Sequence, residues 1–440
     1  MEPIQKKAID YIDSQRGEAR EVAREIWKFA EPALTEFKSS ALLCDVLEGA
    51  GFSVQRGVGD LPTAFIAKWG DAGPVIGILG EYDALPHCGS AHDQNGHGCG
   101  HNLFGTACAY GAIAVARALK ETKTPGRIVC FGCPAEETLE GKVYMARDGA
   151  FEGLDAVLTW HPHWGNYARA GSTNAMDSIA FEFFGKSAHA ARDPWDGRSA
   201  LDAVEIMNYG VNMMREHMIE EARIHYVIRD GGVQPNVVPS YARVWYYVRA
   251  PKRIIVNELS QRVRNCAQAG ALASETEMKE TLLTAVYETL TNLALAQCVQ
   301  RNFEAVGAHT YTQEEKAFAR KLGFEKPMCE EVLPLNDEHT RPSNERGNVS
   351  WIAPLASLYA ACHAPGTPGH HWSATQQYGM EIGEKGMVTA AKVMAASALE
   401  LITRPALVKE VQAEFKEKTR GFTYDPIIPK GQKPNPLGVR

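Results

Sequence analysis

The stretch PVIGILGEYDALPHCGSAHDQNGHGCGHNLFG, residues 74–105, joins an apolar strand to a loop crowded with metal-binding types of side chain. Its first seven residues are typical of a buried strand. After them, glycines and other small residues separate four histidines, two cysteines and three acidic residues, a composition that fits neither a core strand nor a helix. Ligands bind beyond the carboxyl ends of the strands in an open α/β sheet. This loop is therefore the first candidate for a functional site.

Apolar strands and helices alternate on both sides of this loop. Strands are predicted at 63–69, 74–80, 127–133 and 155–160, and helices within 1–30, from Ser39 or Ser40 to Gly51, at 103–120 and at 141–149. Strands that are apolar throughout and alternate with helices are typical of a parallel sheet covered on both faces. The sequence therefore predicts an α/β domain with a mostly parallel mixed sheet flanked by helices.

From about residue 174 the pattern changes to the order β-α-β-β-α-β, which is that of a ferredoxin-like domain. The elements are strands at 176–185, 222–232, 241–250 and 278–287, and helices at 198–218 and 252–270. In the third of these strands apolar and polar residues alternate, as in a sheet with one buried face. We predict an inserted domain over 174–290 and a catalytic domain formed by 1–173 and 291–440.

The C-terminal part returns to the first domain. A helix is expected near 289–305, a charged loop region over 312–348, and a last long helix over 378–403. The tail from Gly421 is rich in proline and glycine, and we expect it to wrap the surface or to be loose.

The composition is that of an ordinary globular protein, with 45% hydrophobic and 22% charged residues among 440. A net charge of −7 argues against a generally basic nucleic-acid-binding surface. Ten cysteines are too sparse for a disulfide scaffold. The N-terminus lacks the pattern of a signal peptide, and no run of 18 uncharged apolar residues occurs. We expect a cytoplasmic protein without nucleic-acid or membrane partners.

Candidate metal ligands follow three of the predicted strands. Cys99 and His101 lie in the first loop, Glu136 and Glu137 follow the strand that ends at residue 133, and His161 follows the next strand. Any one of them alone is more often a solvated or hydrogen-bonded side chain. Together they form a set suited to zinc, with manganese or cobalt as alternatives. The helix that starts beside Cys99 is expected to favour its thiolate.

Seven motifs, in order along residues 30–375, carry a family resemblance: GEYDALP, GHGCGHNLFGTA, CPAEE, DAVLTWHP, GKSAHAARDPWDGRSALDA, GGVQPNVVP and GTPGHHW. They resemble the co-catalytic metallo-amidohydrolases and metallopeptidases, which include carboxypeptidase G, aminoacylase, hippurate hydrolase and plant auxin-conjugate hydrolases. The CGHN form, the WHP and the NVSW segment resemble the subgroup that hydrolyses p-aminobenzoyl-glutamate. The resemblance implies a phosphorylase/hydrolase-like catalytic domain with an inserted lid and dimerisation domain.

The resemblance also implies two divalent metal ions per chain, zinc or manganese. The side chains similar to the family's ligands are Cys99 as the bridge between the metals, and His101, Glu137, His161 and a C-terminal histidine. In GTPGHHW that histidine is His370 or His371, and the alignment favours His370. Glu136 resembles the general base, and Asp83 resembles the aspartate that orients a metal ligand.

Three residues of the inserted domain complete the implied site. His189, in GKSAHAA, is similar to a histidine that stabilises the oxyanion and that often comes from a partner subunit. Asn236, in GGVQPNVVPS, is similar to an asparagine that contacts substrate. Arg249 either binds a substrate carboxylate or is a residue of the sheet surface. The implied assembly is a homodimer or larger oligomer formed through the lid, or a complex with a related partner subunit.

Two departures from the family pattern bear on the substrate. Asn102 replaces an aspartate that many relatives carry. Residues 343–347 read Ser-Asn-Glu-Arg-Gly where related sequences read Ser-Thr-Asp-Val-Gly. A carboxylate is kept at Glu345 on a longer side chain, so the exact substrate stays open. Tryptophans near the motifs are candidates for stacking on an aromatic ring, namely Trp160, Trp164, Trp195 and Trp372.

The function expected from these residues is metal-dependent hydrolysis of the amide bond of an N-acyl amino acid. The acyl group is expected to be aromatic, as in p-aminobenzoyl-glutamate, and Glu136 is expected to act as general base toward a metal-activated water. One alternative keeps the chemistry on another amino-acid conjugate or a dipeptide. Two others are a thiol hydrolase with Cys99 as nucleophile and a non-catalytic subunit of a hydrolase complex.

Overall fold

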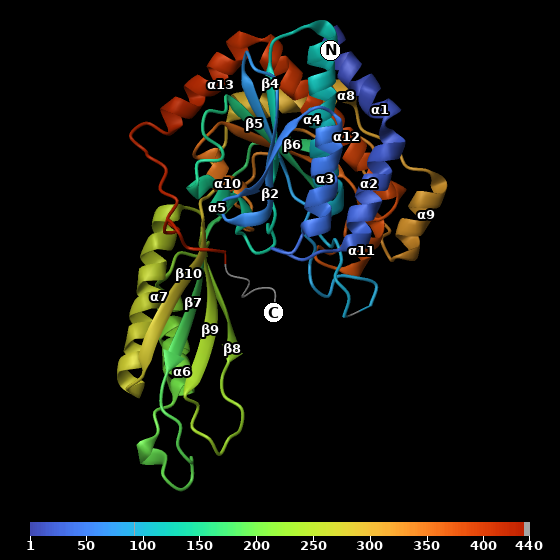
Figure 1. Ribbon diagram of the computed structural model, residues 1–440. Helices are drawn as coiled ribbons and strands as arrows, with labels where there is room; N and C mark the ends of the chain where they lie inside the picture. Colours follow the sequence, from blue (N-terminus) through green and yellow to red (C-terminus); the bar gives the residue numbers. More distant parts are fainter. Residues whose placement is uncertain (92, 435–440) are drawn as a thin grey trace.

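The computed structural model describes residues 1–91 and 93–434, so His92 of the first loop lies outside the described residues. Seven strands form the central sheet of the body (Figure 1), in the order β1 (Ser53–Val58), β2 (Leu61–Trp69), β4 (Arg127–Gly132), β3 (Val75–Gly80), β5 (Ala156–His163), β11 (Leu355–Ala361) and β6 (Tyr167–Arg169). The pairs β4–β3, β3–β5 and β5–β11 are parallel. The outer pairs are antiparallel. The predicted mostly parallel mixed sheet is confirmed.

Helices cover both faces of this sheet (Figure 1). One face shares a core with α1 (Pro3–Ser14), α2 (Arg16–Phe29), α3 (Phe37–Gly49), α4 (His101–Thr122), α8 (Leu293–Val306) and α12 (Glu381–Thr403). The other face packs against α5 (Gly141–Arg147). Ile76 and Ile78 point into the first core and Leu79 into the second, as the alternation of a strand requires. The remaining helices of the body are α9 (Gln313–Lys321), α10 (Arg346–Ser350), α11 (Trp372–Tyr378) and α13 (Pro405–Lys418).

The helices α4 and α12 are long and apolar enough to cross a membrane by length and composition alone. Their most apolar windows are, however, 94% and 89% buried inside the protein. Core helices pass the same test of length and composition, and these two pack against each other and against the sheet.

A second unit projects from the body (Figure 1) and contains a four-stranded sheet. The strand order is β10 (Glu277–Val286), β7 (Ala175–Phe184), β9 (Tyr241–Ala250) and β8 (Arg223–Asp230), with every pair antiparallel. The helices α6 (Ala200–Met214) and α7 (Arg253–Ser274) pack on it. Short 3₁₀ turns lie at Pro194–Asp196 and Arg215–His217. The predicted ferredoxin-like element order is found, and the boundaries at 174 and 290 stay a prediction.

The predicted cap of α3, Ser39 or Ser40, was wrong by three or four residues, because the N-cap is Glu36 and the capping group comes from upstream. The helix begins at Phe37, and the carboxylate of Glu31 accepts hydrogen bonds from the backbone N–H groups of Lys38 and Ser39, at 3.0 and 2.9 Å. These are the second and third N–H groups of the helix, which need an outside acceptor. Ser39 is thus a capped residue and donates its own hydroxyl to Glu31.

Other differences are elements that the sequence analysis did not include. The helix α9 lies in the region predicted as a loop, and a reciprocal capping box between Thr312 and Glu315 starts it. The strands β1 and β6 and the helix α13 were not predicted. The strand β5 continues through His163, so His161 lies inside it. The tail lies against the body and the second sheet, since Ile428 is 2% exposed and Gln432 donates to the carbonyl of Leu282 at 2.6 Å.

Candidate active site

The carboxyl ends of the four parallel strands meet at one edge of the central sheet, and each leads to candidate ligands. Glu81 and Asp83 follow β3, Glu136 and Glu137 follow β4, His161 lies in the last part of β5, and the segment after β11 leads to His370. The sequence motifs are therefore far apart along the chain and close together in space, as the topology of a parallel sheet dictates.

A glycine turn sets Cys99 and His101 side by side at the start of α4. Gly100 between them has a φ of 77°, in the left-handed region that glycine enters without steric cost. A Cβ atom at this position would come within 2.9 Å of the ring of Pro162. The turn thus requires glycine both for its conformation and for the close approach of β5, which carries His161.

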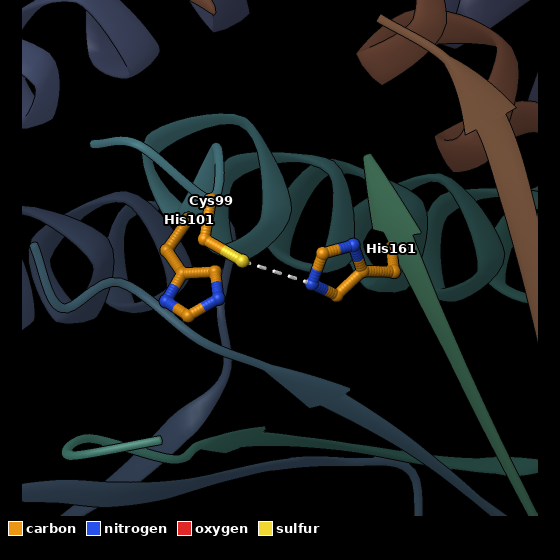
Figure 2. A group of neighbouring side chains, drawn as sticks. All are labelled: Cys99, His101 and His161. Carbon is orange, nitrogen blue, oxygen red and sulfur yellow. Dashed lines mark hydrogen bonds between the residues drawn. The ribbon is translucent and has the colours of Figure 1, made fainter. Parts of the chain in front are cut away.

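Seven candidate ligands form three overlapping groups, in each of which the ligand atoms lie within 4.8 Å of one another. The groups are Cys99–His101–His161, Cys99–Glu137–His370 and Glu81–His101–Glu136. Figure 2 shows the first group, in which the sulfur of Cys99 lies 3.3 Å from Nε2 of His161. Cys99 and His101 each belong to two of the groups, and Cys99 links the group of His161 to that of His370, which is the position that a bridging ligand would occupy. All five predicted metal ligands are brought together.

The structure separates the roles of the two adjacent histidines. His370, with a left-handed φ of 55°, places Nε2 at 3.6 Å from a carboxylate oxygen of Glu137. His371 instead caps α11, since its ring accepts a hydrogen bond from the backbone N–H of Ser373 at 3.3 Å. The preference for His370 over His371 is therefore supported by the geometry.

Asp83 holds two members of the cluster in place. Its carboxylate lies 2.8 Å from Nδ1 of His101 and accepts the backbone N–H of Glu137 at 2.9 Å. Burial raises the pKa of Asp83, but the charge and hydrogen bond of His101 outweigh it and lower this pKa below its ordinary value. With Nδ1 engaged, His101 presents Nε2 to the interior of the cluster, as the predicted orienting role requires.

The donor set fits divalent cations. Glu81 Oε2, His101 Nε2 and Glu137 Oε1 are buried and have no hydrogen-bond partner among the described residues, although the first two lie 3.3 Å apart. Buried polar atoms without a partner are costly, and these three converge on the same small region. Thiolate, imidazole and carboxylate are together the ligand types of zinc sites, and the carboxylates also suit manganese.

The protein does not by itself make Cys99 a thiolate, contrary to the expectation from the helix start. Burial, followed by the charge of Glu137, raises the pKa of this thiol above its ordinary value. The neighbouring His161 is held neutral, because burial and the charge of His101 lower its pKa. A cation in the cluster would supply the missing charge. This electrostatic setting disfavours the alternative in which Cys99 is a nucleophile activated by histidine.

Glu136 lies in a buried group of charges beside the cluster. Burial, then the charges of Glu81 and Glu345, raises its pKa well above the ordinary value. Lys142 sits between these two neighbours, with Nζ at 2.6 Å from Glu81 and 3.0 Å from Glu345. The amide of Asn344 donates to Oε1 of Glu136 at 2.6 Å. The departure from the family pattern at residues 343–347 thus lies against the candidate general base.

The turn that carries Glu136 and Glu137 is supported by a buried carboxyl group that the sequence analysis missed. Ala135 adopts a φ of 55°, which costs about 1–2 kcal/mol for a residue other than glycine. Its N–H donates to Glu36 at 2.8 Å, and Glu36 also accepts from Leu34 and from the hydroxyl of Thr63. The only sequence signal for this role is an acidic residue directly before α3.

The cluster opens into a cavity of about 1060 Å³ whose wall includes several aromatic side chains. The ring centroids of His163 and Tyr359 lie 4.6 Å apart, and Tyr167 lies within 5.5 Å of both. Of the tryptophans predicted as stacking candidates, only Trp164 lines this cavity. Trp160 is fully buried in the core, Trp195 lies in a 3₁₀ turn of the second unit, and Trp372 starts α11.

The second unit contributes to the cavity only through the base of its sheet. Tyr247 and Arg249 of β9 line the cavity, whereas His189 and Asn236 do not. These two lie at the far end of the sheet, where the N–H of Ala190 donates to the carbonyl of Asn236. The extended strand from Arg249 back to Tyr241 alone spans about 26 Å. One chain therefore does not bring His189 and Asn236 to the cluster.

Residues 77–363 match the sequence profile of peptidase family M20/M25/M40. The match covers more than half of the chain and includes every strand end described above except the segment at His370. The chain belongs to this family. It is accordingly a hydrolase of amide or peptide bonds, as the resemblance of its motifs predicted.

Relatives of the whole chain support the assignment to the M20 family. The chain is 37% identical to one of the subunits of p-aminobenzoyl-glutamate hydrolase of Escherichia coli, over 99% of this chain and 100% of that protein. It is 32% identical to Xaa-Arg dipeptidase of Mus musculus, over 95% of this chain and 93% of that protein. The fold is similar to that of YXEP of Bacillus subtilis, described as a dinuclear metal binding peptidase, with a TM-score of 0.59, 16% identity and coverage of 89% and 99%.

Proposed function

We propose that this M20-family hydrolase cleaves the amide bond of an N-acyl amino acid with an aromatic acyl group, such as p-aminobenzoyl-glutamate. The observation that carries the proposal is the convergence of Cys99, His101, Glu137, His161 and His370 on one cluster, with Glu136 beside it. The 37% identity to a component of p-aminobenzoyl-glutamate hydrolase supports the substrate class. The aromatic group of His163, Tyr167 and Tyr359 in the cavity wall supports an aromatic acyl group.

We propose that the five ligands hold two divalent metal ions, zinc or manganese, with Cys99 as the shared ligand. When bound, such ions supply Lewis acidity and lower the pKa of water toward neutrality. Asp83 then keeps His101 oriented. Glu136 accepts the proton of the attacking water at a carboxylate oxygen and later delivers it to the leaving nitrogen. Asn344 holds the other oxygen of Glu136 during both transfers.

The lid residues enter this mechanism through a second chain. The outer strand β8 has exposed apolar side chains at Tyr226, Val227 and Ile228 and an unpaired edge within the described sheet. Unprotected edges of this kind pair readily with another strand. We propose a dimer formed through this edge, in which His189 of one chain stabilises the oxyanion in the other and Asn236 contacts the same substrate. A related partner chain in place of a second copy is the alternative, because the Escherichia coli relative is one component of a hydrolase with more than one kind of chain.

Within the chain's own cavity, Arg249 is the proposed ligand of the substrate α-carboxylate. Its guanidinium makes no hydrogen bond or ion pair with a described residue and lies over the ring of Tyr247 at 5.2 Å. A stacked guanidinium with free N–H groups is well suited to bidentate recognition of a carboxylate.

The test combines elemental analysis of the purified chain with an assay of glutamate release from p-aminobenzoyl-glutamate. We expect about two metal ions per chain, activity that is lost on chelation, and recovery with zinc or manganese. Two metals without glutamate release would move the substrate to another amide conjugate or a dipeptide. Activity that is indifferent to chelation and lost on alkylation would support a thiol hydrolase, and a metal-free, inactive chain would support a non-catalytic role in a hydrolase complex.

A further inference from the structure

The cavity wall contains two buried arginines, Arg169 and Arg346, whose charges no described carboxylate neutralises. They are 5% and 6% exposed, and both line the cavity together with Cys99, Glu136 and His161. Neither forms an ion pair with a described aspartate or glutamate, and Nε of each is buried without a hydrogen-bond partner among the described residues. An uncompensated buried charge is strongly unfavourable, so this arrangement is suited to an anion that enters the cavity.

Arg346 is the first residue of the short helix α10 and follows Glu345 directly. Its backbone N–H is bonded to Asn344 at 2.8 Å, which fixes the start of α10. The adjacent carboxylate of Glu345 is paired with Lys142 at 3.0 Å and does not contact the guanidinium. The side chain of Arg346 is buried, yet it makes no hydrogen bond to a described residue. The guanidinium therefore retains its capacity to bind a ligand.

The hydrogen bonds of Arg169 go to neutral groups only. It donates to the carbonyl of Glu338 at 3.0 Å and to the side chain of Asn336, and its guanidinium lies over the ring of Tyr359 at 5.5 Å. These contacts orient the guanidinium without neutralising its charge. Burial lowers the pKa of Arg169, and the positive charge of Arg346 lowers it further, while Tyr359, Tyr167 and the carboxylate of Glu338 raise it by less than burial lowers it.

We propose that Arg346 and Arg169 bind a second carboxylate of the substrate, in addition to the α-carboxylate assigned to Arg249. The preferred substrate is then the N-acyl derivative of an acidic amino acid, and a cationic side chain such as that of an Xaa-Arg dipeptide is rejected by repulsion. This inference rests on the proposed amide hydrolase function and adds the two residues that select the leaving group.

The experiment compares p-aminobenzoyl-glutamate with p-aminobenzoyl-glutamine, which has the same shape and one fewer carboxylate. In the metal-loaded protein we expect kcat/KM to be roughly 10- to 100-fold higher for the glutamate compound, mainly through KM. Arg346→Gln and Arg169→Gln should remove most of this preference and leave the glutamine compound nearly unaffected. Arg346→Lys should restore part of it. Arg301→Gln, at a half-exposed arginine paired with Glu400, is the matched control and should leave kcat/KM unchanged for both compounds.

Calorimetric binding of the same two compounds to the metal-free protein separates this inference from the proposed function. Tighter binding of the glutamate compound, lost in Arg346→Gln, supports the two arginines even if the loaded protein hydrolyses neither compound. Hydrolysis of both compounds at equal kcat/KM, or variants that weaken both equally, would overturn the inference while leaving amide hydrolysis intact. An equal loss for both compounds is the signature of a purely structural role.

Discussion

At the scale of single residues, Cys99 is the side chain shared by two of the three candidate ligand groups. Its sulfur belongs to both the group with His161 and the group with Glu137. A thiol in this position stays protonated without a cation, because burial raises its pKa. The same atom is therefore expected to link metal binding to the release of a proton.

Replacement of Cys99 by alanine should lower the metal content from about two ions per chain to one or none, since both groups lose a ligand. Elemental analysis of the purified variant measures this directly. Cys329→Ala is the control, because Cys329 is a half-buried cysteine outside the ligand groups. Full occupancy in Cys99→Ala would remove Cys99 from the bridging position.

The adjacent histidines offer a second matched pair. His370→Ala should lower metal content and activity with little change in the free energy of unfolding of the metal-free chain. His371→Ala should keep the metals and cost about 0.5–2 kcal/mol of stability, because it removes the side-chain cap of α11. Metal analysis and denaturant unfolding distinguish the two, and the reverse pattern would exchange their assignments.

Replacement of the adjacent glutamates, Glu136 and Glu137, should have different effects on turnover and on metal content. Glu136→Gln is expected to keep the metals and lose most turnover, by a factor of about 10² or more, because the amide cannot accept the proton of water. Glu137→Gln should instead reduce metal content, since Glu137 shares a group with Cys99 and His370. Unchanged turnover in Glu136→Gln would mean that another residue is the base.

The proximity of these candidate ligands could be predicted because the chemistry of the residues and the ends of the strands coincide. Metal-binding side chains follow apolar strands at Cys99, His101 and Glu137, and His161 lies in the last part of another strand. The family resemblance supplied the fifth candidate ligand, His370. Glu36 could not be predicted, because its role depends on a left-handed turn at Ala135, 99 residues away, that has no local signature. The buried Arg169 could not be predicted either, because it lies in β6, a strand that the sequence analysis did not include.

At the scale of secondary structure, Glu36 couples α3 and β2 to the turn after β4. It accepts hydrogen bonds from Ala135 and Thr63, and it lies near Asp83. Burial, then the charge of Asp83, raises the pKa of Glu36 from 4.5 to about 8. A carboxyl group whose pKa is higher in the folded chain binds its proton more tightly there than in the unfolded chain.

This contribution to stability is complete below about pH 4.5 and is lost as the pH rises through about 8. In the metal-free protein, the free energy of unfolding should therefore fall over this interval. The fall in the free energy of unfolding should be shallower in Glu36→Gln, because the amide does not titrate in this range. Its NH₂ group is able to donate a hydrogen bond to the hydroxyl oxygen of Thr63. Denaturant unfolding at a series of pH values measures both slopes, and identical slopes would contradict the raised pKa.

Helices and strands were predictable where the hydrophobic pattern was long and regular. They were not predictable where a single contact with a distant residue determines where the element begins. The alternation in β9 and the apolar run of β3 are properties of the local sequence. The start of α3 depends on Glu31, which acts across a bend in the chain. The helix α9 has the local capping signal Thr312-x-x-Glu315, but its nine residues are mostly polar, so the segment was predicted as part of a charged loop. The strand β6 has only three residues, too few for a pattern.

At the scale of the whole molecule, the distance between His189 and the cluster is the main feature that the sequence could not show. His189 and Asn236 lie beside each other at the far end of the second unit, while Arg249 lies at its base. A shared site between two chains accounts for both positions. The motif identifies His189 as a candidate site residue, but it does not indicate whether His189 acts in the site of its own chain or in that of a second chain.

Mixing two inactive variants tests this arrangement. His189→Ala and Glu136→Gln should each be nearly inactive alone, and dimers that contain one chain of each should regain one complete site. After exchange of chains, half of the dimers are mixed, so we expect activity to recover to about a quarter of the wild-type value. Val227→Lys in both chains, at the β8 edge, should abolish recovery by preventing dimer formation. No recovery from mixtures that sedimentation shows to be dimeric would place the partner's contribution elsewhere.

The position of β11 has a consequence for synthesis of the chain on the ribosome. This strand lies between β5 and β6, yet about 190 residues separate it from both in the sequence. Until it emerges, β5 has an open hydrogen-bonding edge lined by apolar side chains, and such edges promote association between nascent chains. All strands of the second unit have been synthesised before that point, so we expect this unit to fold before the central sheet of the body is complete. Chains that terminate before residue 355 should therefore be targets for chaperones, although they carry four of the five candidate metal ligands.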